Sequence, residues 1–316
     1  MKIINFQVPT VLKSSDPLAL KQTSLALITL ALAGCAKPLP AEKMESLVIT
    51  ESHKVIDLHG EWINGGKTTE VLIRPGGNGP PENVVLRNCR IRGSVRIMGQ
   101  GRNGQAEAVK QSSHSEGHTE RAQAAAPHNI LLSNVEFEAK GRIPLYLAPG
   151  VTRVRVEGCQ FRGASVATVI YLDAESAQNT IQGNVFETKA SREVLAVDGS
   201  ARNRICDNLF SYAQHGGVYL YRNSGEGGTV RHQTPSGNTI KNNHFNLAGL
   251  SSGAYGVWLG SRNGRSVYRN ADKGYNFGSS IDDRDFADHN KVLNNTFAGS
   301  SRSIRDDGRQ NRTVPQ

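Results

Sequence analysis

The chain has 316 residues, of which 37% are hydrophobic and 6% aromatic, and it carries a formal net charge of +9 at pH 7. This composition is too polar for a protein with many membrane spans and too rich in aliphatic residues for a chain that is disordered throughout. The positive charge fits nucleic acid, anionic lipid or an acidic polysaccharide as a partner, and it does not distinguish among them.

The first segment has the features of an export signal. Basic residues precede an apolar run over residues 24–33, and a short Leu-Ala-Gly sequence then leads to Cys35. The segment resembles a bacterial lipoprotein signal, which implies cleavage before Cys35 and lipidation of that residue. Ala36 after the cysteine implies an outer-membrane location. The alternatives are a plain signal peptide or a short anchor, since the apolar run is too short to cross a bilayer.

A repeated pattern follows the signal. An apolar residue recurs at Ile91, Phe137, Phe161, Phe186, Phe210, Phe245 and Phe297, and an aliphatic residue stands five positions earlier each time. Three positions earlier stand Asn88, Asn134, Gly158, Gly183, Asp207, Asn242 and Asn294. All of these tolerate a left-handed backbone, so the column predicts a turn. Steps of 24, 25 and 24 residues separate Phe137, Phe161, Phe186 and Phe210. This period predicts a β-solenoid.

Two further features belong to each repeat. Two positions before the phenylalanine, the last four copies carry Asn184, Asn208, Asn243 and Asn295, which predicts a ladder of amide hydrogen bonds between coils. A second short strand follows each copy, at residues 143–147, 169–172, 194–197, 217–220 and 256–259. Its alternation directs Leu145, Ile170, Leu195, Val218 and Val257 inward.

These repeats resemble those of the right-handed parallel β-helix, or pectate-lyase-like, superfamily over about residues 55–308. The resemblance implies an all-β solenoid of about 7–9 coils, and it indicates architecture more than chemistry. We therefore divide the chain into a signal peptide (1–34), a lipidated cysteine with a tether (35–50), a β-helix (51–308) and a tail (309–316). Cys89, Cys159 and Cys206 are expected to be buried free thiols.

Three insertions interrupt the repeat at the same corner: residues 98–127, 221–237 and 260–288. Long loops on a rigid stack commonly build a site, so we expect these insertions to form the walls of a groove. The first insertion contains His114, Glu116 and His118, but its sequence predicts no helix that would align metal ligands. We therefore interpret those residues as part of a polar loop.

The outward positions between the insertions supply a floor for the groove. Tyr146, Tyr171, Tyr219 and Trp258 form one row, and Tyr221 belongs to the next row. Exposed aromatic rings on a rigid face suit stacking against sugars, which makes these five residues candidates for substrate binding. The alternative is that the rings form a small second core beneath the insertions.

Asp173 and Asp198 occupy one row on successive coils, so we expect their carboxylates to lie roughly 5 Å apart. Such a pair suits acid–base or nucleophilic work in glycoside cleavage, or binding of Ca²⁺, whose ligands the sequence does not define. The alternative is a pair of aspartates that begin turns.

The densest polar segment spans residues 215–235. Arg222 is a candidate for neutralising a uronate carboxylate, and His215 or His232 for transferring a proton. Glu226 and Arg231 are candidates for substrate binding. The alternative is that Arg222, Glu226 and Arg231 form an ion-paired clasp that orders the insertion.

The sequence thus favours an exported lipoprotein that cleaves or epimerises an acidic polysaccharide, as a lyase, a hydrolase or an epimerase. The alternatives are a glycan-binding or structural envelope lipoprotein without catalytic activity, and a rod used for assembly. The expected partners are an acidic polysaccharide and a membrane reached through the lipid anchor. Nucleic acid is not expected, because the basic residues are scattered and not interleaved with aromatic residues. The oligomeric state is undefined.

Overall fold

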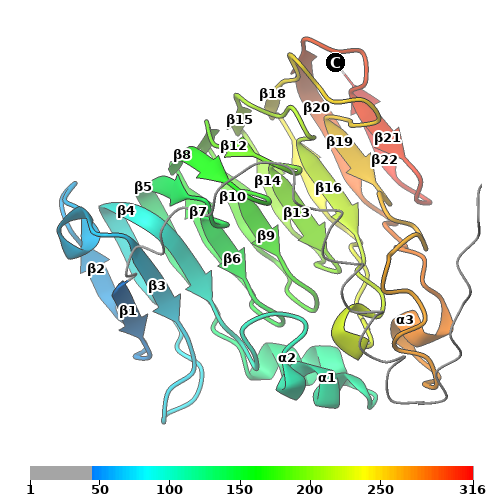
Figure 1. Ribbon diagram of the computed structural model, residues 1–316, viewed down its shortest axis with the longest axis horizontal. Helices are drawn as coiled ribbons and strands as arrows, with labels where there is room; N and C mark the ends of the chain where they lie inside the picture. Colours follow the sequence, from blue (N-terminus) through cyan, green and yellow to red (C-terminus); the bar gives the residue numbers. More distant parts are fainter. Residues whose placement is uncertain (1–44, 316) are drawn as a thin grey trace, which may run out of the picture. The chain divides into compact units, whose positions relative to one another are not determined.

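The computed structural model describes residues 45–315. The predicted signal peptide, Cys35 and most of the tether therefore lie outside the described residues. The described part is a stack of parallel strands in which the order of the coils follows the sequence (Figure 1). No helix in this part of the chain is long and apolar enough to cross a membrane.

One face of the solenoid is a parallel sheet in which each strand pairs with the equivalent strand of the next coil. We call it the tyrosine face, because it carries Tyr146 and Tyr171. Its strands are β1 (Glu45–Ile49), β3 (Thr69–Ile73), the second half of β4 (Val85–Ile97), β6 (Leu145–Leu147), β9 (Ile170–Leu172), β13 (Leu195–Asp198), β16 (Val218–Tyr221), β19 (Val257–Leu259) and β21 (Ile304–Asp306).

The remaining strands form the opposite face and are also paired in parallel. They are β2 (Val55–Asp57), the first half of β4, β5 (Leu131–Lys140), β7 (Arg155–Glu157), β8 (Gln160–Ser165), β10 (Thr180–Gln182), β11 (Val185–Phe186), β12 (Lys189–Ala190), β14 (Arg204–Cys206), β15 (Leu209–Phe210), β17 (Thr239–Lys241), β18 (His244–Asn246), β20 (Lys291–Ala298) and β22 (Arg312–Pro315). The short helices are η1 (Ile63–Gly66), α1 (Glu107–Ser113), α2 (His118–Ala124), η2 (Glu226–Gly228) and α3 (Gly278–Ile281).

The predicted turn column is confirmed. Its members Asn88, Asn134, Gly158, Gly183, Asp207, Asn242 and Asn294 all have left-handed φ angles, between 50° and 65°. Only glycine and short polar residues adopt this conformation at low cost, which explains why the column contains no other residue type. The turn redirects the chain between the two strand segments of each coil on this face.

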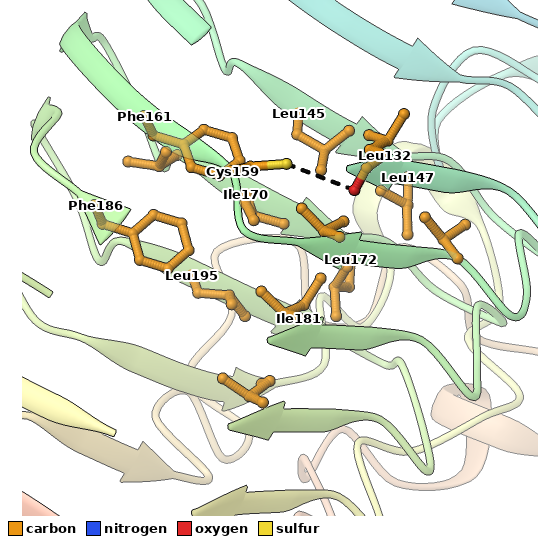
Figure 2. Packing of buried hydrophobic residues seen from close by; sticks show 14 of the residues in the cluster. Leu132, Leu145, Leu147, Cys159, Phe161, Ile170, Leu172, Ile181, Phe186 and Leu195 are labelled. Atoms are coloured by element: carbon orange, nitrogen blue, oxygen red, sulfur yellow. Dashed lines mark hydrogen bonds between the residues drawn. The ribbon is translucent and has the colours of Figure 1, made fainter. Parts of the chain in front are cut away.

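The interior is a continuous apolar core between the two faces (Figure 2). Phenylalanine rings from successive coils stack with centroids 4.4–5.0 Å apart, from Phe137 to Phe297. The three described cysteines are free and buried, as predicted. Burial raises the pKa of Cys159 to about 12, so this thiol acts as a small apolar side chain.

The predicted asparagine ladder is present. The Asn184 amide donates to Asn208 Oδ1 at 3.0 Å, and the pattern continues to Asn243 and Asn295 at 2.9 Å per step. A second ladder that we did not predict joins Asn179, Asn203, Asn238 and Asn290 at distances of 2.8–3.1 Å. The side chains of both ladders also accept hydrogen bonds from buried backbone N–H groups, such as those of Asn184 and Asn203.

Three expectations about local structure need correction. The expected tether contains β1, which pairs with β3, and the expected tail contains β22, which pairs with β20. The solenoid therefore extends beyond both boundaries that the sequence suggested. The first insertion, expected to lack helices, forms α1 and α2. Both helices bury apolar residues, Val109 and Ala122, and this packing stabilises helices too short to persist alone.

Candidate functional site

A cavity of about 490 Å³ lies on the tyrosine face where the insertions meet. Tyr146 of β6 and Tyr171 of β9 contribute from the strands. The first insertion contributes residues 103–105, the second contributes Asn223 and Glu226, and the third contributes residues 261, 262 and 265–268. The three insertions therefore do line one site, as their common corner predicted.

The floor of the cavity is a pair of stacked tyrosines. Tyr146 and Tyr171 are in register on neighbouring strands, and their rings lie 5.1 Å apart with planes 8° from parallel. Each residue is only 9% exposed. The expectation of an exposed aromatic row is therefore wrong. These rings pack with Tyr219 and Tyr221 into a small second core, because the insertions cover them.

The other end of that row is less enclosed. Trp258 is partly buried, meets the Tyr219 ring edge-on at 5.5 Å and donates its indole N–H to Asp307 at 2.9 Å. Neither Trp258, Tyr219 nor Tyr221 lines the cavity. Of the five aromatic candidates, the structure brings only Tyr146 and Tyr171 to the site.

The two aspartates lie directly behind these tyrosines. The Tyr146 hydroxyl donates to Asp173 at 2.5 Å, and the Tyr171 hydroxyl donates to Asp198 at 2.6 Å. Asp173 also accepts from the Gly104 amide at 2.8 Å. Both carboxylates are at most 1% exposed and neither lines the cavity. These carboxylates therefore act on a ligand in the cavity only through residues that line it, among them the two tyrosines.

Burial determines the protonation of these pairs. Loss of water raises the pKa of Asp173, and the Arg231 guanidinium, 3.5 Å from the carboxylate, acts in the opposite direction. Burial and the neighbouring carboxylates raise the pKa of Tyr146 and Tyr171 well above the ordinary value for a phenol. The two phenols therefore remain protonated donors near neutral pH.

Arg231 and Glu226 form the ion pair that the clasp alternative described. Their side chains lie 3.2 Å apart, and Arg231 is only 1% exposed. Gln105 donates to the other Glu226 oxygen at 2.7 Å, which connects the first and second insertions. Glu226 therefore lines the cavity with both of its oxygens already hydrogen-bonded.

Arg222 lies beneath the insertions and outside the cavity. It is 2% exposed, and it donates to the carbonyl oxygens of Asp282 and Arg284, each at 2.5 Å. Its own backbone N–H donates to Asp285 at 2.9 Å. This buried arginine therefore joins the second and third insertions, and in this structure its guanidinium does not reach a ligand in the cavity.

The two histidine candidates lie apart from the cavity and from each other. His215 is exposed and its Nδ1 lies 2.9 Å from the Ser251 hydroxyl. His232 is partly buried, with Nε2 2.8 Å from the Ser113 carbonyl and its ring against His118 and Phe277. The structure thus brings neither imidazole to the cavity lining.

Three arginines that we did not single out from the sequence line the cavity: Arg192, Arg262 and Arg265. Arg192 pairs with Glu193 at 3.1 Å. The Arg262 guanidinium lies over the Tyr221 ring at 4.2 Å, and no carboxylate among the described residues pairs with Arg262 or Arg265. Arg262 and Arg265 belong to the third insertion, which was the only hint of a role, whereas Arg192 lies between β12 and β13, outside all three insertions.

The aspartate pair does not fit a calcium site. Its oxygens already accept hydrogen bonds from hydroxyl and amide groups, and a guanidinium lies beside Asp173. Within residues 45–315, no group of three or more His, Cys, Asp or Glu side chains is arranged to hold a metal ion.

Comparison with known proteins concerns the architecture. A family model described as a right-handed beta helix region matches residues 62–272. The fold is similar to that of PfbA, a surface adhesin of Streptococcus pneumoniae, at 12% identity over 84% of this chain and 71% of the adhesin chain, with a TM-score of 0.41. It is also similar to the A-module of the Azotobacter vinelandii mannuronan C-5 epimerase AlgE6, at 12% identity over 78% of this chain and 63% of the module, with a TM-score of 0.40.

The chain thus spans less than two thirds of the length of the epimerase module. No curated protein matches the sequence. At this level of identity, the likeness to the solved structures concerns the fold alone.

Proposed function

We propose that this chain, which belongs to the right-handed β-helix family, binds an acidic polysaccharide in the cavity above Tyr146 and Tyr171. The observation that carries the proposal is the pair of arginines, Arg262 and Arg265, that line the cavity without a carboxylate partner among the described residues. A guanidinium left in this state favours an anionic ligand, and a planar carboxylate is its natural partner.

The remaining cavity features support a sugar as the bearer of that carboxylate. Tyr146 and Tyr171 line the cavity with the small part of each ring that stays accessible, beside polar side chains such as Gln105, and this mixture suits the C–H groups and hydroxyl groups of a pyranose ring. The volume of about 490 Å³ falls within the range of small-molecule sites, which fits a short segment of a glycan chain.

Binding is tested with the soluble chain from Ala36 onward and a panel of acidic and matched neutral oligosaccharides. We expect Arg262→Gln to weaken binding of the acidic members by roughly tenfold, as expected for loss of a charge-assisted hydrogen bond. Arg269→Gln is the matched control, because Arg269 is exposed in the same insertion and does not line the cavity. Equal binding of acidic and neutral members, or an equal effect of both substitutions, would contradict the proposal.

Cleavage or epimerisation of the bound glycan is a second candidate function. It is favoured by the position of Asp173 behind Tyr146, since Tyr146 donates a hydrogen bond to the carboxylate and is one of the residues that line the cavity. A proton can pass between a ligand and the carboxylate through this one hydroxyl, and a carboxyl group with a raised pKa suits such a transfer.

This second function is tested on the same oligosaccharides by absorbance at 235 nm and by reducing-end formation. A rise at 235 nm would identify a lyase, and reducing ends alone a hydrolase. Nuclear magnetic resonance of the sugar protons would detect epimerisation. We expect Asp173→Asn to abolish product formation while binding is retained. Binding by the wild-type chain with no product in any of these assays would leave binding as the function.

The location in the cell envelope is also a proposal. It rests on the apolar run before Cys35, which precedes the described residues. We propose that lipid on Cys35 anchors the β-helix to the outer membrane. We expect the expressed chain to partition into a detergent phase and the Cys35→Ser variant to remain in the aqueous phase. Partition of the variant equal to that of the wild type would contradict the anchor.

A further inference from the structure

Asn223 lies where Asp198, Tyr171 and the cavity meet. Its side-chain Nδ2 donates to Asp198 Oδ2 at 2.9 Å and to the Tyr171 hydroxyl at 3.1 Å. Its backbone N–H donates to the other Asp198 oxygen at 2.7 Å. The residue is 3% exposed and belongs to the cavity lining. Asp198 thus holds both ends of this residue against the floor of the site.

These contacts fix the orientation of the Asn223 amide. A carboxylate accepts hydrogen bonds and cannot donate, so a flipped amide would place two acceptors against each other. Nδ2 must therefore face Asp198, which leaves Oδ1 as the free end of the side chain. Oδ1 is buried and has no hydrogen-bond partner among the described residues. A buried acceptor without a partner is costly, and it requires an explanation.

A second residue that lines this cavity also has a buried polar atom without a hydrogen-bond partner among the described residues. Thr168 is fully buried just before β9, it lines the cavity, and its Oγ1 has no hydrogen-bond partner among the described residues. Thr168, Asn223 and Tyr171 all line this one cavity. Two such atoms at one cavity indicate polar ligand groups that would satisfy them.

We infer that Asn223 Oδ1 and Thr168 Oγ1 bind free hydroxyl groups of the sugar residue at Tyr171, and that Asp198 is a positioning residue that keeps the Asn223 amide in its accepting orientation. This inference rests on the proposed function and names the ligand more narrowly. The ligand is a uronic acid residue with unsubstituted ring hydroxyls. An O-acetylated residue has no hydrogen to donate to Asn223, and its acyl group needs space beside a buried side chain.

The test measures binding of matched pairs of oligouronates, free and O-acetylated, by titration calorimetry. The wild-type chain is expected to prefer the free form. Asn223→Ala and Thr168→Val are each expected to weaken binding of the free form by roughly tenfold. Neither change should alter binding of the acetylated form, so the ratio of the two affinities falls toward one.

Asp198→Asn distinguishes positioning from simple support of the fold. An amide at position 198 can donate or accept, so the Asn223 amide is free to flip. We expect the affinity ratio to fall as it does in Asn223→Ala. Combining Asp198→Asn with Asn223→Ala should not lower the affinity ratio further, because both changes remove the same contact with the ligand. Loss of affinity for both ligand forms in equal proportion would indicate a structural role, and it would overturn the positioning role.

Two outcomes separate this inference from the proposed function. If wild-type binding of oligouronates is clear but the affinity ratio is the same in all variants, the hydroxyl contacts are wrong and the proposed function stands. If the wild-type chain binds no oligouronate, the proposed function fails and the inference fails with it. Melting temperatures of all variants, measured alongside, identify any variant that is not folded. In that case Asn223→Ser, which shortens the side chain and retains a polar group, replaces Asn223→Ala.

Discussion

At the scale of single residues, buried asparagines of neighbouring coils satisfy each other's hydrogen bonds. Asn208 accepts from the backbone N–H and the side chain of Asn184, and it donates to Asn243 Oδ1 and to the Ile181 carbonyl. Every polar atom of this side chain therefore has a partner in a neighbouring coil. A polar residue is tolerated inside the solenoid because the same residue recurs one coil away.

Replacing one member of the ladder tests this account. Asn208→Leu leaves the Asn184 N–H groups and the Ile181 carbonyl buried without partners, at about 1–3 kcal/mol for each unsatisfied group. We expect a loss of roughly 3–5 kcal/mol in the free energy of unfolding, measured with urea at pH 7.5. The control is Asn246→Leu at an exposed position of the next coil. A loss below about 1 kcal/mol for Asn208→Leu would show that the ladder contributes little.

The sequence contains a second asparagine column that we did not use for a prediction. The second ladder stands five positions before the first in each of the four coils that share it, from Asn179 to Asn290. Its signal was therefore present in the sequence. The partners that the insertions supply, Gly104 for Asp173 and Asn223 for Asp198, carried no such signal, because the insertions do not repeat.

At the scale of elements, the insertions fold by packing against one another. Helix α2 begins at His118 without a side-chain cap, after Gly117 in a left-handed conformation. His118 is 1% exposed, and its Nδ1 lies 3.0 Å from the Ser112 hydroxyl of α1. The His232 ring of the second insertion lies 5.2 Å away. The helix is therefore held by contacts that its own seven residues do not encode.

This packing predicts a pH dependence. Burial lowers the pKa of His118 from 6.5 to about 3, and the nearby His232, Arg231, Arg121 and His114 act in the same direction. The unfolded chain therefore binds a proton below about pH 6.5 that the folded chain does not bind, so stability falls as pH decreases from about 6.5 toward 3. Between pH 7.5 and 5 we expect this group to contribute a loss of about 2 kcal/mol.

The measurement compares urea unfolding at pH 7.5 and pH 5 for the wild-type chain and for His118→Gln. The variant should lose less stability between the two pH values than the wild type, by about 2 kcal/mol. The same substitution at the exposed His215 is the control. If His118→Gln and the wild type lose the same stability on acidification, His118 is not the group that responds.

At the scale of the whole solenoid, the two terminal coils differ from the inner coils because each has a neighbouring coil on one side only. Each inner coil is paired on both sides, whereas a terminal strand presents unpaired backbone groups. At the C-terminal end, β22 pairs with β20 in parallel, and β21 covers β19. Residues that read as a tail in the sequence therefore continue the stack over its last coil.

Removal of this segment is expected to weaken the fold. Deleting residues 309–316 exposes the edge of β20, so we expect the melting temperature to fall by roughly 5 °C and the chain to self-associate. Scanning fluorimetry and light scattering after size-exclusion chromatography measure the two effects. A chain that lacks only the last residue is the control. An unchanged melting temperature with a monodisperse shortened chain would show that β22 is dispensable.

The repeat pattern was sufficient to predict the solenoid, its turn column, the first asparagine ladder and the corner at which the insertions leave. These features repeat with the coil, so a single residue type in a column reports the same environment each time. The contacts of the insertions could be learned only from the three-dimensional structure. It placed Arg262 over Tyr221, Gly104 against Asp173 and Asn223 against Asp198, and it buried the tyrosines expected to be exposed. These contacts join segments up to about 70 residues apart that follow no period, so packing alone brings them together.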